Sequence, residues 1–225
     1  MVKNPTQYGL MKSFPKKYDF FKDREGRAAF IAKIFKNELA QAHSVLDVGC
    51  DYNTLKKIIG PKVIGVDLYG NPDFKIDFEK EKLSRFGDRE FDLVVCTEVL
   101  EHLENFHAMI DELARVSDKY ILISLPNCMD FFTRCSIFFQ GKAGKFYGLP
   151  FEKPEDRHRW FFNHLDLEQF FHNYANKHAL RIADRFLHCN FGASWEGTLI
   201  RFLTEAFRVD SIAQSYWILL EKEKL

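Results

Sequence analysis

The chain has 225 residues, and its 46% hydrophobic and 28% charged side chains are typical of a globular protein and exclude general disorder. Its 32 basic and 32 acidic residues cancel to a formal net charge of zero, so bulk charge does not predict a nucleic-acid partner. The amino end lacks a secretory pattern, no uncharged run is long enough to span a bilayer, and the five cysteines form no Cys-x-x-Cys pair, so we expect a soluble, cytoplasmic protein.

Short apolar runs alternate with helical patterns in the first half of the chain. The helical spacing of apolar residues predicts a helix over 24–39. Strands are then predicted at 43–48, 62–66, 91–96 and 120–125, with a weaker strand at 74–78. Because helical patterns at 53–59 and 98–116 separate these runs, the first half resembles a parallel sheet with helices on both faces.

The pattern changes after residue 127. An aromatic-rich insert is predicted at 128–165, after the fourth strong strand, and a C-terminal part at 166–225. The C-terminal part contains predicted helices at 165–177 and 198–207 and predicted strands at 180–189 and 215–221. We therefore expect one α/β domain over 1–225, doubly wound and Rossmann-like. Its sheet is predicted to be seven-stranded and mostly parallel with an antiparallel C-terminal strand, and 24–127 is the cofactor-binding half.

Paired phenylalanines mark the insert, Phe131-Phe132 and Phe138-Phe139 among them. Three interpretations are open: additional core, a lid whose aromatic side chains cover an apolar substrate, or an interfacial helix that contacts a membrane. Core packing is favoured because paired phenylalanines recur in other predicted helices. The lid comes next, since membrane contact would predict more basic residues in the segment.

Acidic and polar residues follow the predicted strands, where open α/β sheets bind their ligands. Gly49 allows a sharp turn after the first strand, and Asp67 ends the second strand where a carboxylate accepts two hydrogen bonds from a ribose diol. These residues indicate a nucleoside cofactor. A nicotinamide cofactor is disfavoured, because the turn has one glycine and Asp51 would repel a pyrophosphate, so a cationic cofactor without phosphate fits better.

Five segments occur in an order that resembles a known family: VLDVGCDYNTL, VIGVDL, IDFEKEKL, FDLVVCTEVLEHL and YILISLPN. Together they resemble the motifs of the class I S-adenosylmethionine-dependent methyltransferases over about residues 28–127. The resemblance implies S-adenosylmethionine as cofactor, with Asp47 and Gly49 at its methionine end and Asp67 on the ribose hydroxyls. The other cofactor-binding residues it implies are Asp77 and Phe78 at the adenine, and Thr97 and Glu98 on the next strand.

The turn after the first strand departs from the family pattern Asp-x-Gly-x-Gly-x-Gly, because Asp51 and Asn53 replace the last two glycines. Asn53 can keep a left-handed turn, and Asp51 can pair with the cofactor's amino group or face its sulfonium, so both are predicted to bind cofactor. The alternative is an inactive methyltransferase-like domain that serves as a binding or scaffolding module.

The segment HRWFFNHLDLEQFF resembles the family's histidine and aromatic stretch near the substrate opening. Because methyl transfer depends mainly on alignment, a base is optional, and His158 is the first candidate for it and His102 the second. His102 otherwise packs or caps its helix. No spacing suggests a metal site. We expect a small, partly apolar or aromatic acceptor and no nucleic acid, with membrane contact less favoured and the oligomeric state open.

Overall fold

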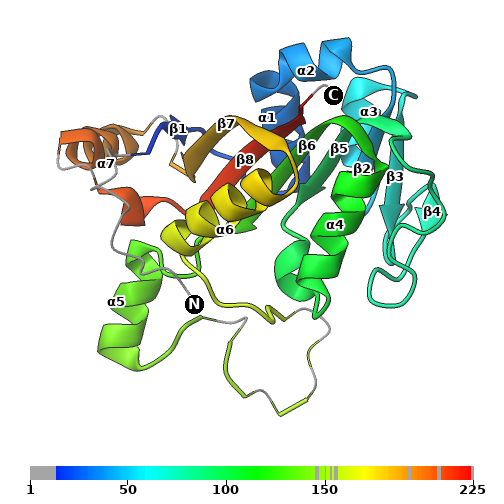
Figure 1. The fold of residues 1–225 in the computed structure, drawn as a ribbon. Helices are drawn as coiled ribbons and strands as arrows, with labels where there is room; N and C mark the ends of the chain where they lie inside the picture. The colour runs from blue at the N-terminus through cyan, green and yellow to red at the C-terminus, as the bar shows by residue number, and fades with distance from the viewer. Residues whose placement is uncertain are drawn as a thin grey trace.

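An eight-stranded mixed sheet forms the centre of the protein in the computed structural model, which describes residues 14–144, 147–149, 151–152, 154, 157–191, 194–206 and 209–223 (Figure 1). The strands are β1 (Lys16–Tyr18), β2 (Val45–Val48), β3 (Val63–Asp67), β4 (Phe74–Lys75), β5 (Phe91–Thr97), β6 (Ser117–Pro126), β7 (Leu180–Cys189) and β8 (Ser215–Lys222). The helices are α1 (Arg24–Ile34), α2 (Lys36–Gln41), α3 (Thr54–Ile59), α4 (Phe106–Val116), α5 (Phe131–Gln140), α6 (His164–Lys177) and α7 (Trp195–Ala206), with 3₁₀ turns η1 (Leu100–His102) and η2 (Asp210–Ile212).

The strand order is β1-β7-β8-β6-β5-β2-β3-β4. Neighbouring strands from β6 to β4 pair in parallel, whereas β8 lies antiparallel between β6 and β7. This topology confirms the predicted doubly wound sheet with an antiparallel C-terminal strand. The strand order reverses at β2, which has β3 on one side and β5 on the other, and such a switch point is where these sheets bind ligands.

The seven predicted strands are all present, and the sheet has an eighth. Strand β1 pairs in parallel with β7 along Lys16–Tyr18. Its sequence, KKY, has no apolar run, so the strand could not be recognised by patterning. It forms because β7 offers an open edge with unpaired backbone groups.

Two predicted helices differ from the structure. The helix expected over 24–39 is interrupted at Phe35, whose backbone leaves the helical region (φ −105°, ψ 33°). The ring of Phe35 is buried and stacks on Phe186 and Trp217, so packing against the sheet determines the break. The helix expected over 98–116 begins only at Phe106, because Glu98 is left-handed (φ 57°) and the tight turn η1 follows it.

Apolar side chains alternate between the two faces of the sheet. Leu46 and Val94 belong to one buried cluster, and Val45 and Leu93 belong to a second one. Helices α4 and α6 cover the first face and helices α1, α2 and α3 cover the second (Figure 1). Because both faces are covered, the strands are apolar runs rather than alternating patterns.

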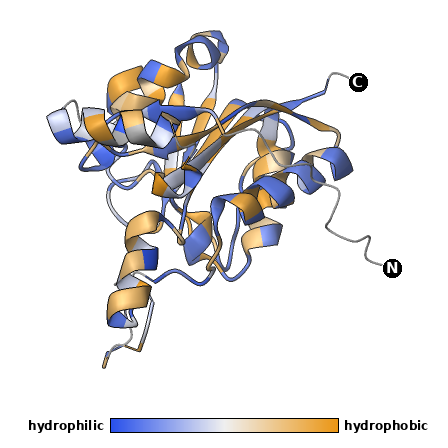
Figure 2. Ribbon diagram, turned by 90° about the vertical axis from the view of Figure 1, so that its left-hand side faces the viewer, coloured by the Kyte–Doolittle hydropathy of each residue, from blue (hydrophilic) through white to orange (hydrophobic). Residues whose placement is uncertain are grey.

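The phenylalanine pairs of the insert do not pack as core, which corrects the interpretation favoured from the sequence, whereas Trp160 and Phe162 near its end do pack against the core. Helix α5 has no buried residue, and it projects from the body of the protein as an apolar element in Figure 2. Residues 145, 146, 150, 153, 155 and 156 of the insert lie outside the described residues. Within the described part of the chain, no helix combines the length and the apolar character needed to cross a membrane.

Candidate active site

A cavity of about 510 Å³ opens at the carboxyl ends of β2, β3 and β5. We call it the first cavity, and its volume is within the range of small-molecule sites. It lies at the switch point of the sheet, as expected for this topology. Six of the predicted cofactor residues line it: Gly49, Asp51, Asp67, Asp77, Phe78 and Glu98.

The turn after β2 is closely packed at Gly49. This residue has a φ of +82°, and a Cβ atom added to it would lie 2.2 Å from Cγ2 of Val99. Asp51 and Asn53 are also left-handed, with φ of 50° and 55°, so the turn keeps its shape without further glycines. The prediction that Asn53 preserves this turn is confirmed.

Asn53 lies away from the cavities, although it was predicted from the sequence to be a cofactor-binding residue. It precedes α3, and its Nδ2 donates a hydrogen bond to the carbonyl of Asn71 at 2.9 Å. Its Oδ1 would lie only 1.7 Å from a Cβ atom at Gly65. Its side chain therefore fills the space between the turn and β3, which gives it a structural role.

Asp51 does not present an unbalanced negative charge to the first cavity. Its carboxylate forms an ion pair with Arg24 of α1. Its backbone N–H donates to Oδ2 of Asp67 at 2.8 Å, and the N–H of Tyr69 donates to Oδ1 of Asp67 at 3.1 Å. The two amides fix the carboxylate of Asp67 at the rim of the cavity, where each oxygen can accept a further hydrogen bond.

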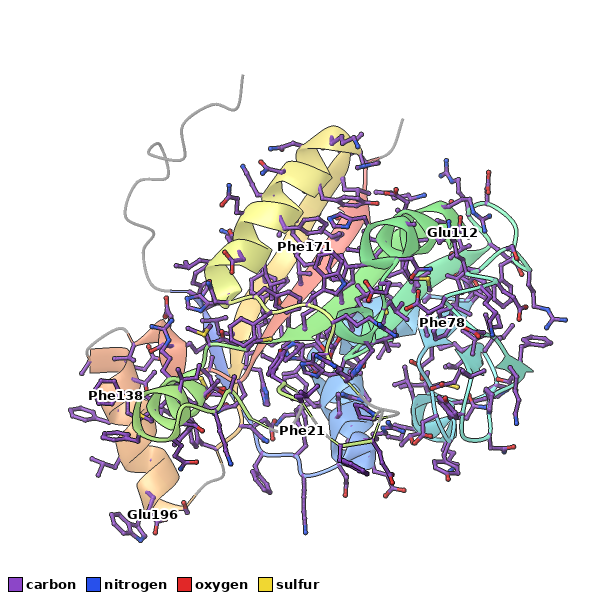
Figure 3. The ribbon with its side chains drawn as sticks, turned by 90° about the horizontal axis from the view of Figure 1, so that it is seen from below. Phe21, Phe78, Glu112, Phe138, Phe171 and Glu196 are labelled. Carbon is purple, nitrogen blue, oxygen red and sulfur yellow. The ribbon has the colours of Figure 1, made fainter. Side chains whose placement is uncertain are left out.

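Asp77 and Phe78 line another part of the first cavity. Asp77 pairs with Lys80 at 2.8 Å and accepts a hydrogen bond from the N–H of Glu79 at 3.1 Å, which orders this loop. The hydrogen bond and charge of Lys80 lower the pKa of Asp77. Phe78 is largely buried in the core and contributes an apolar surface, and Figure 3 shows its position.

Arg27 on α1 is a site residue that was not predicted from the sequence. It lines the first cavity and the second large cavity that is described below. It also lines a small cavity of about 30 Å³, which Asp47 and Thr97 line as well. Burial raises the pKa of Asp47 to about 7, against the opposing charge of Arg27 and with a contribution from Asp67. Burial also raises the pKa of Glu98, opposed by Arg27 and by a hydrogen bond from Ser124.

A second large cavity, of about 400 Å³, adjoins the first. We call it the second cavity, and Phe21, labelled in Figure 3, lines it together with Pro126 at the end of β6. Four residues line both large cavities: Arg24, Arg27, Glu98 and His102. The two spaces therefore meet at charged and titratable side chains, where chemistry between two bound molecules could take place.

The predicted catalytic histidines come together beside this junction. The rings of His102 and His158 pack edge to face with centroids 4.8 Å apart. Glu101, which is 1% exposed, joins them, and its Oε1 lies 3.7 Å from Nε2 of His102. One ligand atom from each residue lies within 4.8 Å of the others, so this Glu-His-His cluster has the donors and the spacing to hold a divalent metal ion.

A strap near the end of the insert, residues 157–160, holds His158 in the cluster. The N–H of Arg159 donates to the carbonyl of Glu101 at 2.8 Å, and its Nε donates to the carbonyl of His102 at 2.9 Å. The indole of Trp160 donates to the carbonyl of Leu103 at 2.6 Å. These bonds fasten the strap to η1, a contact between distant parts of the chain.

Tyr147 orients the ring of His158. Its hydroxyl lies 3.0 Å from Nδ1 of His158 and 3.3 Å from the carbonyl of Trp160. When Nδ1 donates to the Tyr147 oxygen, Nε2 is the ring nitrogen that can take a proton or bind a cation. No sequence signal indicated Tyr147, and Glu101 was missed although it stands in the motif EVLEHL.

The fold and the acidic cavity at its switch point define a class I S-adenosylmethionine-dependent methyltransferase. The chain belongs to the family described as "Methyltransferase domain", which matches residues 20–174. The ubiquinone biosynthesis O-methyltransferase of Dechloromonas aromatica is 35% identical over 89 residues, which cover 32% of this chain and 38% of that protein. The chain thus matches less than half of the length of this curated relative.

Solved structures share the fold. A methyltransferase from Archaeoglobus fulgidus superposes with a TM-score of 0.58 at 21% identity, over 89% of this chain and 95% of that one. Magnesium protoporphyrin IX methyltransferase from Synechocystis, with bound SAH, gives a TM-score of 0.52 at 15% identity over 91% and 90% of the two chains. A small RNA methyltransferase superposes with a TM-score of 0.55 at 17% identity, over 99% of this chain and 28% of that one. The family match therefore makes a methyltransferase the leading interpretation, and the methyl-transfer assay proposed below decides between an active enzyme and an inactive scaffolding module.

Proposed function

We propose that this methyltransferase binds its cofactor in the first cavity and methylates a hydroxyl group of a small, partly apolar acceptor in the second cavity. The junction of the two cavities beside the Glu-His-His cluster carries this proposal. When bound, S-adenosylmethionine supplies a methyl group on a positively charged sulfur that leaves readily. Alignment of the acceptor with that methyl group then provides most of the acceleration.

The residues of the first cavity and of the small cavity beside it suit this cofactor. Asp67 is fixed by two backbone amides and can accept the ribose hydroxyls. The buried carboxyls of Asp47 and Glu98 favour a cation nearby, because a positive charge offsets the cost of ionising them. Arg27, which lines these cavities, has the charge to hold the methionine carboxylate.

The second cavity suits a small acceptor. Its volume of about 400 Å³ holds a ring-sized molecule, which would find apolar contacts at Phe21 and Pro126 and polar or charged side chains at the other lining residues. The curated relative is named an O-methyltransferase, which supports oxygen as the accepting atom. One structural neighbour is named for small RNA, but the formal net charge of zero gives this chain no excess of positive charge that would favour a phosphate backbone.

The Glu-His-His cluster is positioned to activate the acceptor. A hydroxyl group keeps its proton at neutral pH, so its methylation is faster when a nearby group takes the proton while the oxygen–carbon bond forms and the carbon–sulfur bond breaks. His158, oriented by Tyr147, is the first candidate and His102 the second. Deprotonation by a positioned histidine is typically worth about 10²–10⁴-fold in rate.

A second candidate role for the cluster is metal binding, which the close approach of its three ligand atoms favours. No metal was expected from the sequence, because no short spacing suggested one, but the fold supplies His158 from a distant strap. A divalent ion held there would lower the pKa of the acceptor hydroxyl. The Nδ1 contact of His158 with Tyr147 is the kind of outer contact that orients metal-ligating histidines.

The test is transfer of labelled methyl groups to phenolic and catecholic acceptors, to RNA and to a protein extract. We expect label in the small phenols, and a loss of rate in His158→Gln by about 10²-fold or more. His172→Gln, at an exposed position of α6, is the matched control and should leave the rate unchanged. Label in RNA or protein with none in the phenols would overturn the proposal.

Chelation separates the two roles of the cluster. Activity that survives dialysis against a chelator assigns proton uptake to the histidines alone. Activity that is lost and then returns with Mg²⁺, Mn²⁺ or Zn²⁺ assigns the cluster to a metal.

A further inference from the structure

Two helices far apart in the sequence expose aromatic side chains at one end of the protein. On α5, Phe138 is 82% exposed and Phe139 is 77% exposed. On α7, Trp195 is 74% exposed and Phe202 is 68% exposed. Both helices lie at the left of Figure 1, α7 next to β1 and α5 below it, on the side away from α3. Exposed aromatic side chains in this number mark an interaction surface.

Each helix presents its aromatic residues along one face. In α5 the four phenylalanines at 131, 132, 138 and 139 fall within an arc of about 120°, since a helix turns by about 100° per residue. In α7 the side chains of Trp195, Leu199 and Phe202 fall within about 60°. We call these two faces together the aromatic tip. Figure 3 shows Phe138 on the outer side of α5.

We propose that the aromatic tip is a membrane-docking surface that inserts into the interface of an anionic lipid bilayer. Phenylalanine and tryptophan side chains at this exposure gain by entering the boundary between headgroups and acyl chains. The basic residues beside the α5 arc, Arg134 and Lys142, are exposed, and α5 contains no acidic residue between Phe131 and Gln140. This charge suits anionic headgroups.

A lipid surface fits the tip better than a protein partner. The α5 arc holds four phenylalanines and Cys135, so it offers almost no hydrogen-bonding group, whereas a specific protein interface makes about one hydrogen bond per 100–200 Å². The two helices project separately from the body of the protein, and a fluid bilayer can accept both without a matching shape. Glu196 and Glu205 of α7 lie outside its aromatic arc, and Glu205 accepts a hydrogen bond from the hydroxyl of Tyr18.

The tip is connected to the second cavity. Strand β6 ends at Pro126, which lines that cavity, and the short connector Asn127–Asp130 leads directly into α5. We extend the proposal to an acceptor that enters the second cavity from the membrane, which this link along the chain favours. This last step rests on the proposed function, because it assumes that the acceptor is apolar, but the docking itself does not.

The experiment is co-sedimentation with vesicles of phosphatidylcholine and phosphatidylglycerol, compared with vesicles of phosphatidylcholine alone. We expect binding to the anionic vesicles, weakened by about tenfold or more in the double variant Phe138→Ser/Phe139→Ser. Ile58→Ser is the matched control, since Ile58 is an apolar residue of α3 that is 47% exposed on the other side of the protein. Equal thermal unfolding of the variants shows that they are folded.

Tryptophan fluorescence gives a second measurement. Of the three tryptophans, Trp217 is fully buried, Trp160 is half-buried with its indole bonded to the carbonyl of Leu103, and Trp195 is 74% exposed. Trp195 is therefore the one whose emission should shift to the blue when vesicles are added. Equal binding of the wild type and the double variant, or no binding, overturns the proposal. Vesicle-independent dimers that the double variant dissociates assign the tip to a second copy instead. Methyl transfer to a water-soluble phenol, measured without vesicles, tests the proposed function separately.

Discussion

Replacing Asp47 by asparagine tests the electrostatics of the site. Burial raises the pKa of Asp47 from 3.8 to about 7, with Arg27 opposing the rise and Asp67 adding to it. The neighbouring thiols of Cys50 and Cys96 stay protonated there, since burial raises their pKa as well. The pKa of Asp47 is thus about three units higher in the folded protein than in the unfolded chain. At about 1.4 kcal/mol per unit, ionising Asp47 lowers the free energy of unfolding by roughly 4 kcal/mol.

The sign of the pH dependence follows from the raised pKa. Between pH 3.8 and about 7 the folded protein holds a proton on Asp47 that the unfolded chain has released. The contribution of Asp47 to stability is therefore complete at low pH and is lost as the pH rises through about 7. An asparagine side chain does not titrate, so the Asp47→Asn variant should lack this loss and be more stable than the wild type above neutral pH.

The assay is urea unfolding of both proteins at a series of pH values from acidic to mildly alkaline. The difference between the two free energies of unfolding isolates Asp47, because the other groups titrate alike in both proteins. We expect it to change by roughly 4 kcal/mol in favour of the variant as the pH rises. If the free energies of unfolding of the two proteins changed with pH in parallel, the raised pKa of Asp47 would be refuted. Adding S-adenosylmethionine should reduce the wild-type loss, since a bound cation offsets the carboxylate.

Three further substitutions test the site. Asp67→Ala should raise the dissociation constant of S-adenosylmethionine by a factor on the order of ten or more in calorimetric titration. An unchanged dissociation constant would contradict the proposed contact between Asp67 and the ribose. Gly49→Ala should destabilise the fold by about 1–3 kcal/mol, because its Cβ would meet Val99, and adding Val99→Ala should restore part of that loss in urea unfolding. Arg159→Met frees the strap at His158, so kcat should fall on the order of tenfold while Arg159→Lys recovers part of it; equal kcat in both would contradict a positioning role.

The amino-acid sequence by itself determined the sheet. Its short apolar runs are buried on both faces, so their pattern located seven strands and the doubly wound class. The residues that end those runs identified Gly49, Asp67 and Glu98, since the carboxyl ends of parallel strands meet at one edge. Strand β1 was missed because a short polar edge strand depends on the backbone of β7 rather than on its own side chains.

Only the tertiary structure decided which distant side chains meet. His158 joins Glu101 and His102 through the bonds of Arg159 to η1, which no sequence spacing encodes. Arg27 reaches the cavities from a helix that precedes every motif. Asn53 turned inward to fill space above Gly65, and the phenylalanines of α5 turned outward although their pattern suggests core. A helical pattern shows that one face is apolar, but only the neighbouring elements decide whether that face is covered.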